Sequence, residues 1–183
     1  MRKAVLLCMA LVLTIVSSPV VRADESPSSA DLTEAQLATV ARNCASVQST
    51  LGRIYANDAL NRVHLGQEYE TIATKFMATM NSRAGLNRGD VSAMTATTAT
   101  FNKKLDELRA RYQSYKVTIE SASRMQCSST PSEFYDTLVT AQKNRAAVRG
   151  VMLELNVLVG QYSSQVKELR AALKVDALKG SNS

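Results

Sequence analysis

Apolar residues recur at every third or fourth position along three long tracts of this 183-residue chain. No other feature constrains the fold as strongly. A repeat that averages 3.5 residues is typical of helices that pack along a shared seam, with the side chains of one helix inserted between those of its neighbour. The connections between tracts are short, so consecutive helices run antiparallel. The sequence therefore predicts an all-α fold, an elongated antiparallel three-helix bundle or coiled coil that runs up, down and up.

The ends of the tracts set the domain organisation. A capping-box pattern that begins at Asp31 starts the first helix, and Asp90 can cap the second. The helical domain then spans 31–178, after a flexible lead over 24–30 and before a disordered tail over 179–183. The predicted helices cover about 32–83, 90–126 and 131–176.

The first 23 residues have the order of a secretory signal peptide. Arg2 and Lys3 precede an apolar stretch over 4–16, which is shorter than the roughly 20 residues of a membrane span. We expect cleavage after Ala23, so that the mature chain is secreted or extracytoplasmic, at the cell surface or in a periplasm-like space. The alternative is an uncleaved N-terminal membrane anchor.

The net charge of +6 overstates how basic the mature chain is. Removing Arg2, Lys3 and Arg22 with the leader leaves 19 basic against 16 acidic residues. This weak bias, with no run of basic residues, is typical of a solvated mixed-charge surface and disfavours a nucleic-acid partner. We also expect no membrane span after signal cleavage.

Two cysteines, Cys44 and Cys127, remain after cleavage. In a secreted chain they most simply form one disulfide, and the alternative is a pair of buried thiols. Helix geometry favours the disulfide independently, because each cysteine lies about 56–58 Å of helix away from the turn that joins the first two helices. Folding at that turn pairs core residues whose numbers add up to about 170, such as Leu65 with Leu105, and the cysteines fit the same rule.

Two polar residues, Asp58 and Asn61, interrupt the apolar line of the first helix. Buried polar groups are costly unless they are partnered. The helix alignment brings Tyr112 and Arg145, the one charged residue on the third helix's line, to the same height. We therefore predict a buried polar layer of Asp58, Asn61, Tyr112 and Arg145. Our preferred interpretation is that this layer sets the register of the helices, and a ligand site is the alternative.

A second apolar strip lies outside the main line of the third helix. It comprises Val151, Leu153, Val157 and Leu158. The strip either widens the core within one chain or forms an exposed interface for self-association or a partner helix. A homo-oligomer is therefore among the possible assemblies.

Residues for catalysis or metal binding are few. His64 is the only histidine, which excludes a metal site built from several histidines, and we expect it to lie on the surface. The chain has no HExxH, GxSxG, P-loop or dinucleotide-binding motif. We therefore predict that the protein is not an enzyme and has no cofactor and no bound metal.

Several segments resemble known proteins. They are residues 44–49 (CASVQS), 62–69 (RVHLGQEY) and 81–83 (NSR), together with Cys127 and the pair 134–135 (FY). Over about 40–165 the chain resembles a group of small, uncharacterised secreted helical proteins of candidate-phylum bacteria, of the Saccharibacteria kind. The resemblance implies a secreted two-cysteine helical module and no particular chemistry.

These observations favour a non-enzymatic, secreted or surface-associated coiled-coil module that binds a protein or a component of the bacterial cell envelope. The alternative is a holdase-type extracytoplasmic chaperone for secretory clients, which needs an oligomer around an apolar, basic-rimmed cavity. Basic coiled-coil chaperones of the bacterial periplasm share the architecture alone. An enzyme acting on the cell wall has the least support and would need Asp58, Arg145 and His64 to converge around an open cleft.

Overall fold

The computed structural model describes residues 28–86 and 89–180, with side chains up to residue 174. All regular elements in these ranges are helical, which confirms the predicted all-α class. The predicted leader, most of the predicted lead and the last three residues lie outside the described residues. The elements are η1 (Ser29–Asp31), α1 (Glu34–Arg42), α2 (Cys44–Thr71), the π-helix η2 (Ile72–Ala78), α3 (Thr79–Leu86), α4 (Ser92–Arg124) and α5 (Pro131–Gly180).

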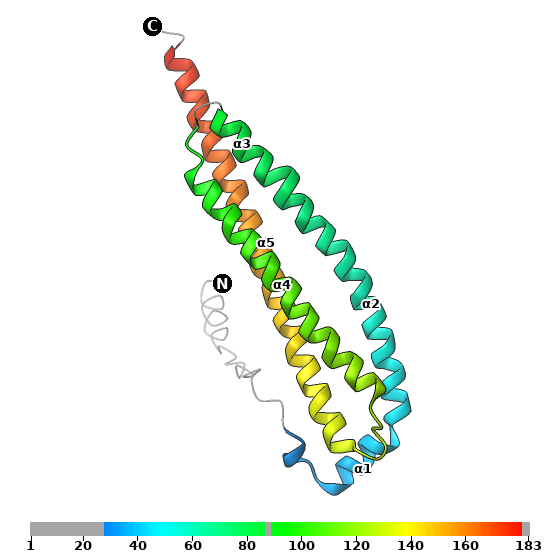
Figure 1. Ribbon diagram of the computed structural model, residues 1–183. Coiled ribbons are helices and arrows are strands. Elements are labelled where there is room, and N and C mark those ends of the chain that lie inside the picture. The colour runs from blue at the N-terminus through cyan, green and yellow to red at the C-terminus, as the bar shows by residue number, and fades with distance from the viewer. Residues whose placement is uncertain (1–27, 87–88, 181–183) are drawn as a thin grey trace, which may run out of the picture.

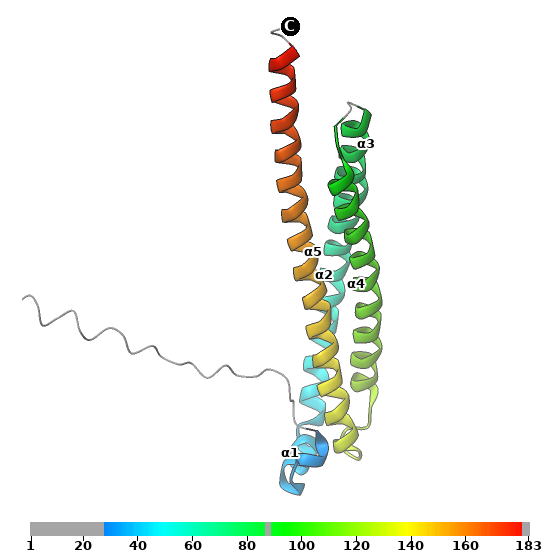
Figure 2. The same cartoon turned by 90° about the vertical axis from the view of Figure 1, so that its left-hand side faces the viewer.

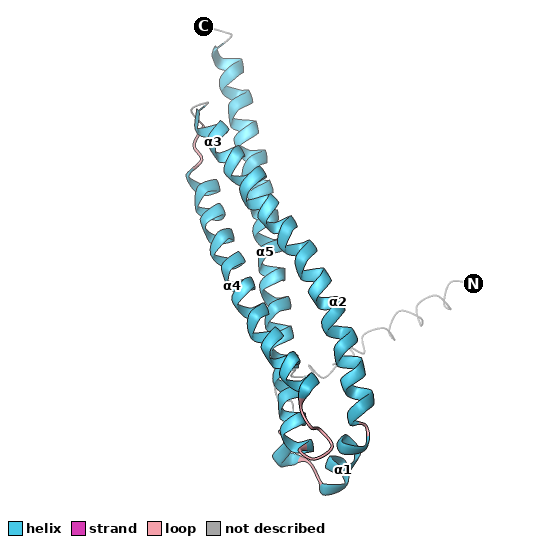
Figure 3. Cartoon of the chain, turned by 45° about the vertical axis from the view of Figure 1, so that its right-hand side comes forward, coloured by secondary structure: helices cyan, strands magenta, loops and turns pink. Residues whose placement is uncertain are grey.

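Three long rods lie side by side in an extended molecule (Figure 1). The first rod is formed by α2, η2 and α3 in succession. The chain then returns along α4 and runs back again along α5, and Figures 2 and 3 show the three rods from two other sides. α4 packs against both of the other rods, so the core follows its length and includes Phe101, Leu105 and Ile119. The core along α4 therefore joins α4 to both of the other rods.

Gly89 follows α3 and lies close to both α3 and α5. Its backbone N–H donates to the carbonyl oxygen of Ala84 at 3.0 Å. A Cβ at this position would lie 2.9 Å from Leu169 Cδ1 and 3.1 Å from the Ala84 oxygen, so any larger residue would force its neighbours to shift. Because Gly89 is level with Leu169, the rest of α5 projects past the other rods (Figures 1 and 2). Leu173 lies on this projection and is exposed.

The N-terminal cap differs from the prediction. Thr33, not Asp31, caps α1, and its capping-box partner is Gln36. Asp31 closes a separate capping box with Ser28 around η1. Its carboxylate is therefore engaged before α1 begins, and the extended conformation of Leu32 separates the two elements.

The prediction of one continuous helix over 32–83 is also wrong. The chain bends at Asn43, whose side-chain amide donates to the Thr39 carbonyl oxygen at 2.9 Å. This bend divides α1 from α2. α1 then turns toward the start of α5 instead of extending the first rod (Figure 1).

The π-helix η2 has a cause in the spacing of the buried side chains. Leu65, Tyr69, Ala73 and Met77 follow one another at intervals of four, and the last three are at most 4% exposed. In an α-helix of 3.6 residues per turn, such a series drifts around the axis and leaves the core. The wider turns of a π-helix keep the series on one face.

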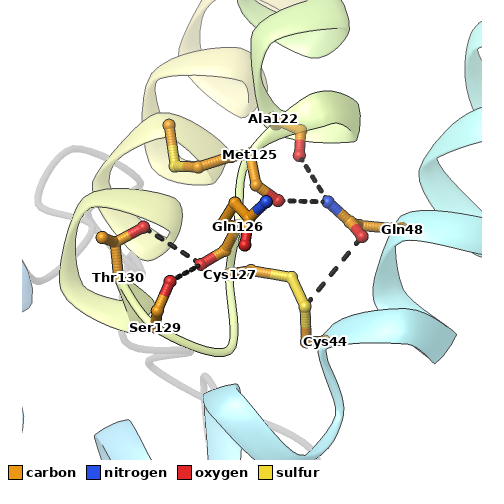
Figure 4. Close-up of a disulfide and its surroundings, with 8 residues drawn as sticks. All are labelled: Cys44, Gln48, Ala122, Met125, Gln126, Cys127, Ser129 and Thr130. Atoms are coloured by element: carbon orange, nitrogen blue, oxygen red, sulfur yellow. Dashed lines mark hydrogen bonds between the residues drawn. A yellow bond between two sulfur atoms is a disulfide. The ribbon is translucent and has the colours of Figure 1, made fainter.

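At the other end of the molecule, the disulfide between Cys44 and Cys127 joins the start of α2 to the loop after α4, which confirms the predicted pairing. Their Cα atoms are 5.5 Å apart. Figure 4 shows Gln48 beside the bond, where its amide donates to the carbonyl oxygens of Met125 (2.7 Å) and Ala122 (3.3 Å) at the end of α4. A side chain of α2 therefore satisfies backbone carbonyl groups that the end of a helix leaves without partners.

The second apolar strip of α5 does not act as one unit. Val151 is buried in the core and Leu158 packs partly against it. Leu153 and Val157 point away from the bundle and are 59% and 69% exposed. Two of the four residues in the strip therefore belong to the core within the chain, and the other two are exposed.

Candidate ligand-binding cleft

A cleft of about 780 Å³ opens partway along the molecule, between α2 and α5, and α4 forms its floor. α2 lines it from Asp58 to Glu70, and α5 lines it from Gln142 to Met152. At 1.5 Å per residue these stretches are about 15–18 Å long. Figure 1 shows α2 curving away from α4 and α5 over this part of the rod.

One end of the cleft holds the central part of the predicted polar layer. Arg145 of α5 donates two hydrogen bonds to Asp58 of α2, from Nε to Oδ2 (2.8 Å) and from Nη2 to Oδ1 (2.9 Å). The hydroxyl of Tyr115 on α4 donates to the same carboxylate at 2.6 Å. The three rods therefore meet at one carboxylate, through a two-pronged arginine contact of the kind that gives strong, directional pairs.

The structure corrects two members of that layer. Tyr115, not Tyr112, hydrogen-bonds to Asp58. Side chains of a helix lean toward its N-terminus, so side chains of antiparallel neighbours lean in opposite directions, and the Asp58 carboxylate meets a residue about one turn further along α4. Asn61 lines the cleft but is exposed and makes no hydrogen bond to another described side chain of the layer.

The layer is also less buried than predicted. The Asp58 side chain is 16% exposed, but the Arg145 side chain is 57% exposed. Arg145 lies on the apolar line of α5, and that line faces the open cleft at this height because α2 and α5 are separated there. The carboxylate is thus inside the rod and the arginine is at the mouth of the cleft.

A second arginine–tyrosine pair lies beside the first. The guanidinium of Arg62 sits over the Tyr112 ring, 4.8 Å from its centroid, in a cation–π contact. Tyr112 packs edge-on against Tyr115, with ring centroids 6.0 Å apart. Among the described residues, no carboxylate forms an ion pair with Arg62. The cleft therefore contains one arginine–tyrosine pair that holds a carboxylate and one that holds none.

Two further arginines line the cleft. Arg109 of α4 forms ion pairs with Glu70 across the floor and with Asp106 on its own helix. Arg149 of α5 forms no ion pair or hydrogen bond with any residue that the structure describes, and it follows Arg145 by one helical turn. The cleft lining thus has four arginines against two carboxylates, Asp58 and Glu70. Its excess charge is positive.

Apolar and aromatic side chains form most of the rest of the lining. They are Val63, Leu65, Leu105, Leu108, Tyr112, Tyr115, Val148 and Met152. A concave apolar surface with a few charged groups is typical of a ligand site. The cleft can therefore take a ligand that has both apolar and anionic parts.

The two tyrosines stay protonated at ordinary pH. Burial, then the hydrogen bond to Asp58, raises the pKa of Tyr115. Burial also raises the pKa of Tyr112, and the nearby charge of Arg62 opposes that shift. The hydrogen bond with Asp58 raises the pKa of Arg145, which keeps its charge. The cleft thus offers neutral hydroxyl groups and permanent positive charge.

The heptad pattern pointed to Asp58 and Arg145 but missed Arg62 and Arg149. A signal for Arg149 was present, because two arginines four residues apart share a helix face and repel each other unless anions or solvent compensate. Arg62 gave no such signal, since it directly follows Asn61 in a stretch whose apolar line is interrupted. Its position over Tyr112 depends on the distance between two helices.

The third hypothesis, an enzyme site around a cleft, lacks its histidine. His64 is exposed on α2 and is not among the cleft-lining residues. Within the described residues, histidine, cysteine and acidic side chains form no group of three or more that could hold a metal ion. Across the same part of the chain, no helix is both long enough and apolar enough to cross a membrane.

Compared with protein-family profiles, curated proteins and solved structures, the chain matches none. The resemblance to secreted helical proteins of candidate-phylum bacteria therefore stays a prediction. The structure itself defines the class as an elongated, disulfide-linked helical protein with an arginine-lined cleft.

Proposed function

We propose that the protein is a non-enzymatic, extracytoplasmic binding module, and that the cleft between α2 and α5 binds a protein or cell-envelope partner. The observation that carries this proposal is the cleft's surplus of arginine over carboxylate above an apolar floor. Arginine is well suited to binding carboxylate and phosphate groups, because its donors form a rigid planar fork. The predicted leader and the disulfide support an extracytoplasmic location.

The carboxylates and tyrosines of the cleft favour binding over catalysis. Asp58 and Glu70, the two acids of the lining, are both engaged by arginines. Tyr112 and Tyr115 have raised pKa values, which removes them further from the range of a general base near neutral pH. These groups position charge and shape but do not supply a base poised to accept a proton.

Crosslinking in the producing cells tests the proposal. A photoreactive amino acid at Gln142, which lines the cleft, should crosslink to one specific partner, and the yield should fall when Arg62→Gln is added. The matched control is a photoreactive residue at Val117, an exposed position of α4 outside the cleft. Equal capture of the same partner from both positions would contradict a cleft site.

Exposed apolar side chains support a second candidate, the holdase-type chaperone. Phe76, Leu153 and Val157 are each more than half exposed, and surfaces of this kind bind unfolded chains. This function predicts an oligomer that suppresses aggregation of a reduced, unfolding client protein. A monomer by sedimentation that leaves client aggregation unchanged would exclude it.

A further inference from the structure

We infer that the unoccupied arginine–tyrosine pair, Arg62 with Tyr112, receives the carboxylate of an acidic side chain in a short, largely apolar peptide segment of the partner, with Arg149 adding attraction from the opposite wall. This inference rests on the proposed function, because it names the ligand class of the same cleft. It concerns the part of the lining that pairs with no carboxylate of the described residues.

The occupied pair serves as an internal example of such binding. Arg145 and Tyr115 together hold one carboxylate, that of Asp58, with three hydrogen bonds of 2.6–2.9 Å. The neighbouring pair repeats the same two side-chain types in adjoining rods, with an arginine beside a tyrosine. A ligand carboxylate there would meet a guanidinium that has no anionic partner among the described residues.

The charge pattern favours a peptide with isolated acids over a uniform polyanion. Asp58 and Glu70 lie in the same lining as the arginines, on either side of Arg62 along α2. A nucleic acid or polyphosphate would bring its charges next to these acids, and such like-charge contacts are unfavourable. A peptide can place one carboxylate at Arg62 and neutral groups elsewhere.

The floor and the length of the cleft define the rest of the ligand. Leu105, Leu108 and Val148 lie along the lining and would pack against apolar side chains next to the acid. A cleft of about 15–18 Å accommodates about five residues of extended chain at roughly 3.3 Å each. The ligand is therefore a segment of a few residues with one acidic side chain among apolar ones.

Fluorescence anisotropy with a defined probe tests this inference on the mature, disulfide-bonded protein. The probe is a six-residue peptide that has one glutamate among uncharged, mostly apolar residues and carries an uncharged dye, and the matched peptide has glutamine in place of that glutamate. We expect the glutamate peptide to bind at least about tenfold more tightly, as charge-assisted hydrogen bonds would provide. Binding should weaken as ionic strength rises, because salt screens the charges.

Three variants locate the binding site. Arg62→Gln should weaken binding of the glutamate peptide about tenfold, and Arg149→Gln several-fold. The control, Arg111→Gln, changes an exposed arginine of α4 outside the cleft and should alter affinity less than about twofold. Circular dichroism melting curves of each variant establish that the fold is kept.

Three results would overturn the inference. They are equal losses for Arg62→Gln and Arg111→Gln, equal binding of the glutamate and glutamine peptides, and displacement of the glutamate peptide by inorganic polyphosphate that binds more tightly. Crosslinking from Gln142 in cells separates this failure from failure of the proposed function. If a partner is captured from Gln142 and the glutamate peptide does not compete with it, the proposed binding module stands and only the proposed ligand class is rejected.

Discussion

At the scale of single residues, Asp58 and Arg145 are unequal members of one ion pair. Asp58 is mostly enclosed and accepts bonds from two helices, whereas Arg145 reaches it from the solvent side. A buried hydrogen-bonding group that loses its partner costs more than an exposed one, because water cannot replace the lost bond. The aspartate should therefore matter more for stability than the arginine.

Alanine substitutions measure this difference. Asp58→Ala should lower the free energy of unfolding by about 1–3 kcal/mol, because it leaves the Tyr115 hydroxyl without its acceptor. Arg145→Ala should cost about 1 kcal/mol or less, since the Arg145 side chain is exposed and Asp58 keeps its bond to Tyr115. Urea unfolding of both variants gives the values, and a larger cost for Arg145→Ala would contradict this description of the layer.

Buried tyrosines make the fold sensitive to alkali. Burial raises the pKa of Tyr115, Tyr69 and Tyr162 in the folded protein above that in the unfolded chain. The unfolded chain therefore loses these protons first, so the stability that the tyrosines contribute is constant below about pH 9 and falls as pH rises past about 10. Each tyrosine that ionises only when unfolded contributes about 1.4 kcal/mol per pH unit to the fall. Urea unfolding at several pH values checks this.

The control for the alkaline effect is Tyr115→Phe, which removes one of the titrating groups. Its stability should decline less steeply above pH 10 than that of the unaltered protein, although its stability at neutral pH is lower by about 1 kcal/mol. Identical slopes would show that Tyr115 does not contribute.

At the scale of elements, sequence predicted α4 well and the first rod less well. Met94, Phe101, Leu105 and Ile119 lie on the heptad line and are buried, because α4 has a neighbour on both sides. The first rod packs against α4 on one side, so its apolar pattern indicates its conformation less clearly. The bend at Asn43 results from a local side-chain bond, which a repeat pattern does not reveal.

The π-helix could have been anticipated from the spacing of its core residues. Four consecutive positions at intervals of four, from Leu65 to Met77, do not fit a repeat of 3.5. The cleft could not have been anticipated in this way. A heptad pattern indicates which face of each helix is apolar but not how far apart two helices lie. Arg62 and Arg149 become a candidate site only when α2 and α5 are placed in space.

The disulfide stabilises the end of the bundle where α1, α2 and the loop after α4 meet. Its cysteines are 83 residues apart in sequence, so the bond removes much of the freedom of the unfolded chain. Replacing Cys44 and Cys127 with alanine should cost about 4–5 kcal/mol in the chain-entropy model. Thermal and urea unfolding measure the loss, and a cost below about 1 kcal/mol would mean that the bond hardly constrains the unfolded state.

At the scale of the whole molecule, the fold creates the cleft by holding three rods at their ends. The disulfide and Gln48 fix one end, and toward the other end Tyr162 of α5 donates to Met77 and Asn81 of the first rod. Between them Asp58 ties α2 to α5 through Arg145 at one end of the cleft. At the other end Tyr69 of α2 ties them again, because its hydroxyl donates to Asn156 Oδ1 (3.1 Å) and to the Met152 carbonyl oxygen (3.4 Å) of α5. The cleft lies between these two ties.

Gly66 of α2 allows the cleft to be blocked, and Gly52 of the same helix gives a matched control position. A Cβ at Gly66 or at Gly52 would meet no other atom within 4 Å, but only Gly66 lines the cleft. Each glycine sits inside a helix, where any other residue except proline is favoured. Gly66→Trp and Gly52→Trp should therefore both fold and differ in whether the added ring occupies the cleft.

The yield of the partner crosslink from Gln142, compared between these two variants in the producing cells, tests the cleft as binding site most directly. We predict that Gly66→Trp reduces the yield about tenfold or more, because the ring fills the space that the partner needs. Gly52→Trp should leave the yield within about twofold of the unaltered protein. Equal yields from both variants would contradict the assignment of function to this cleft.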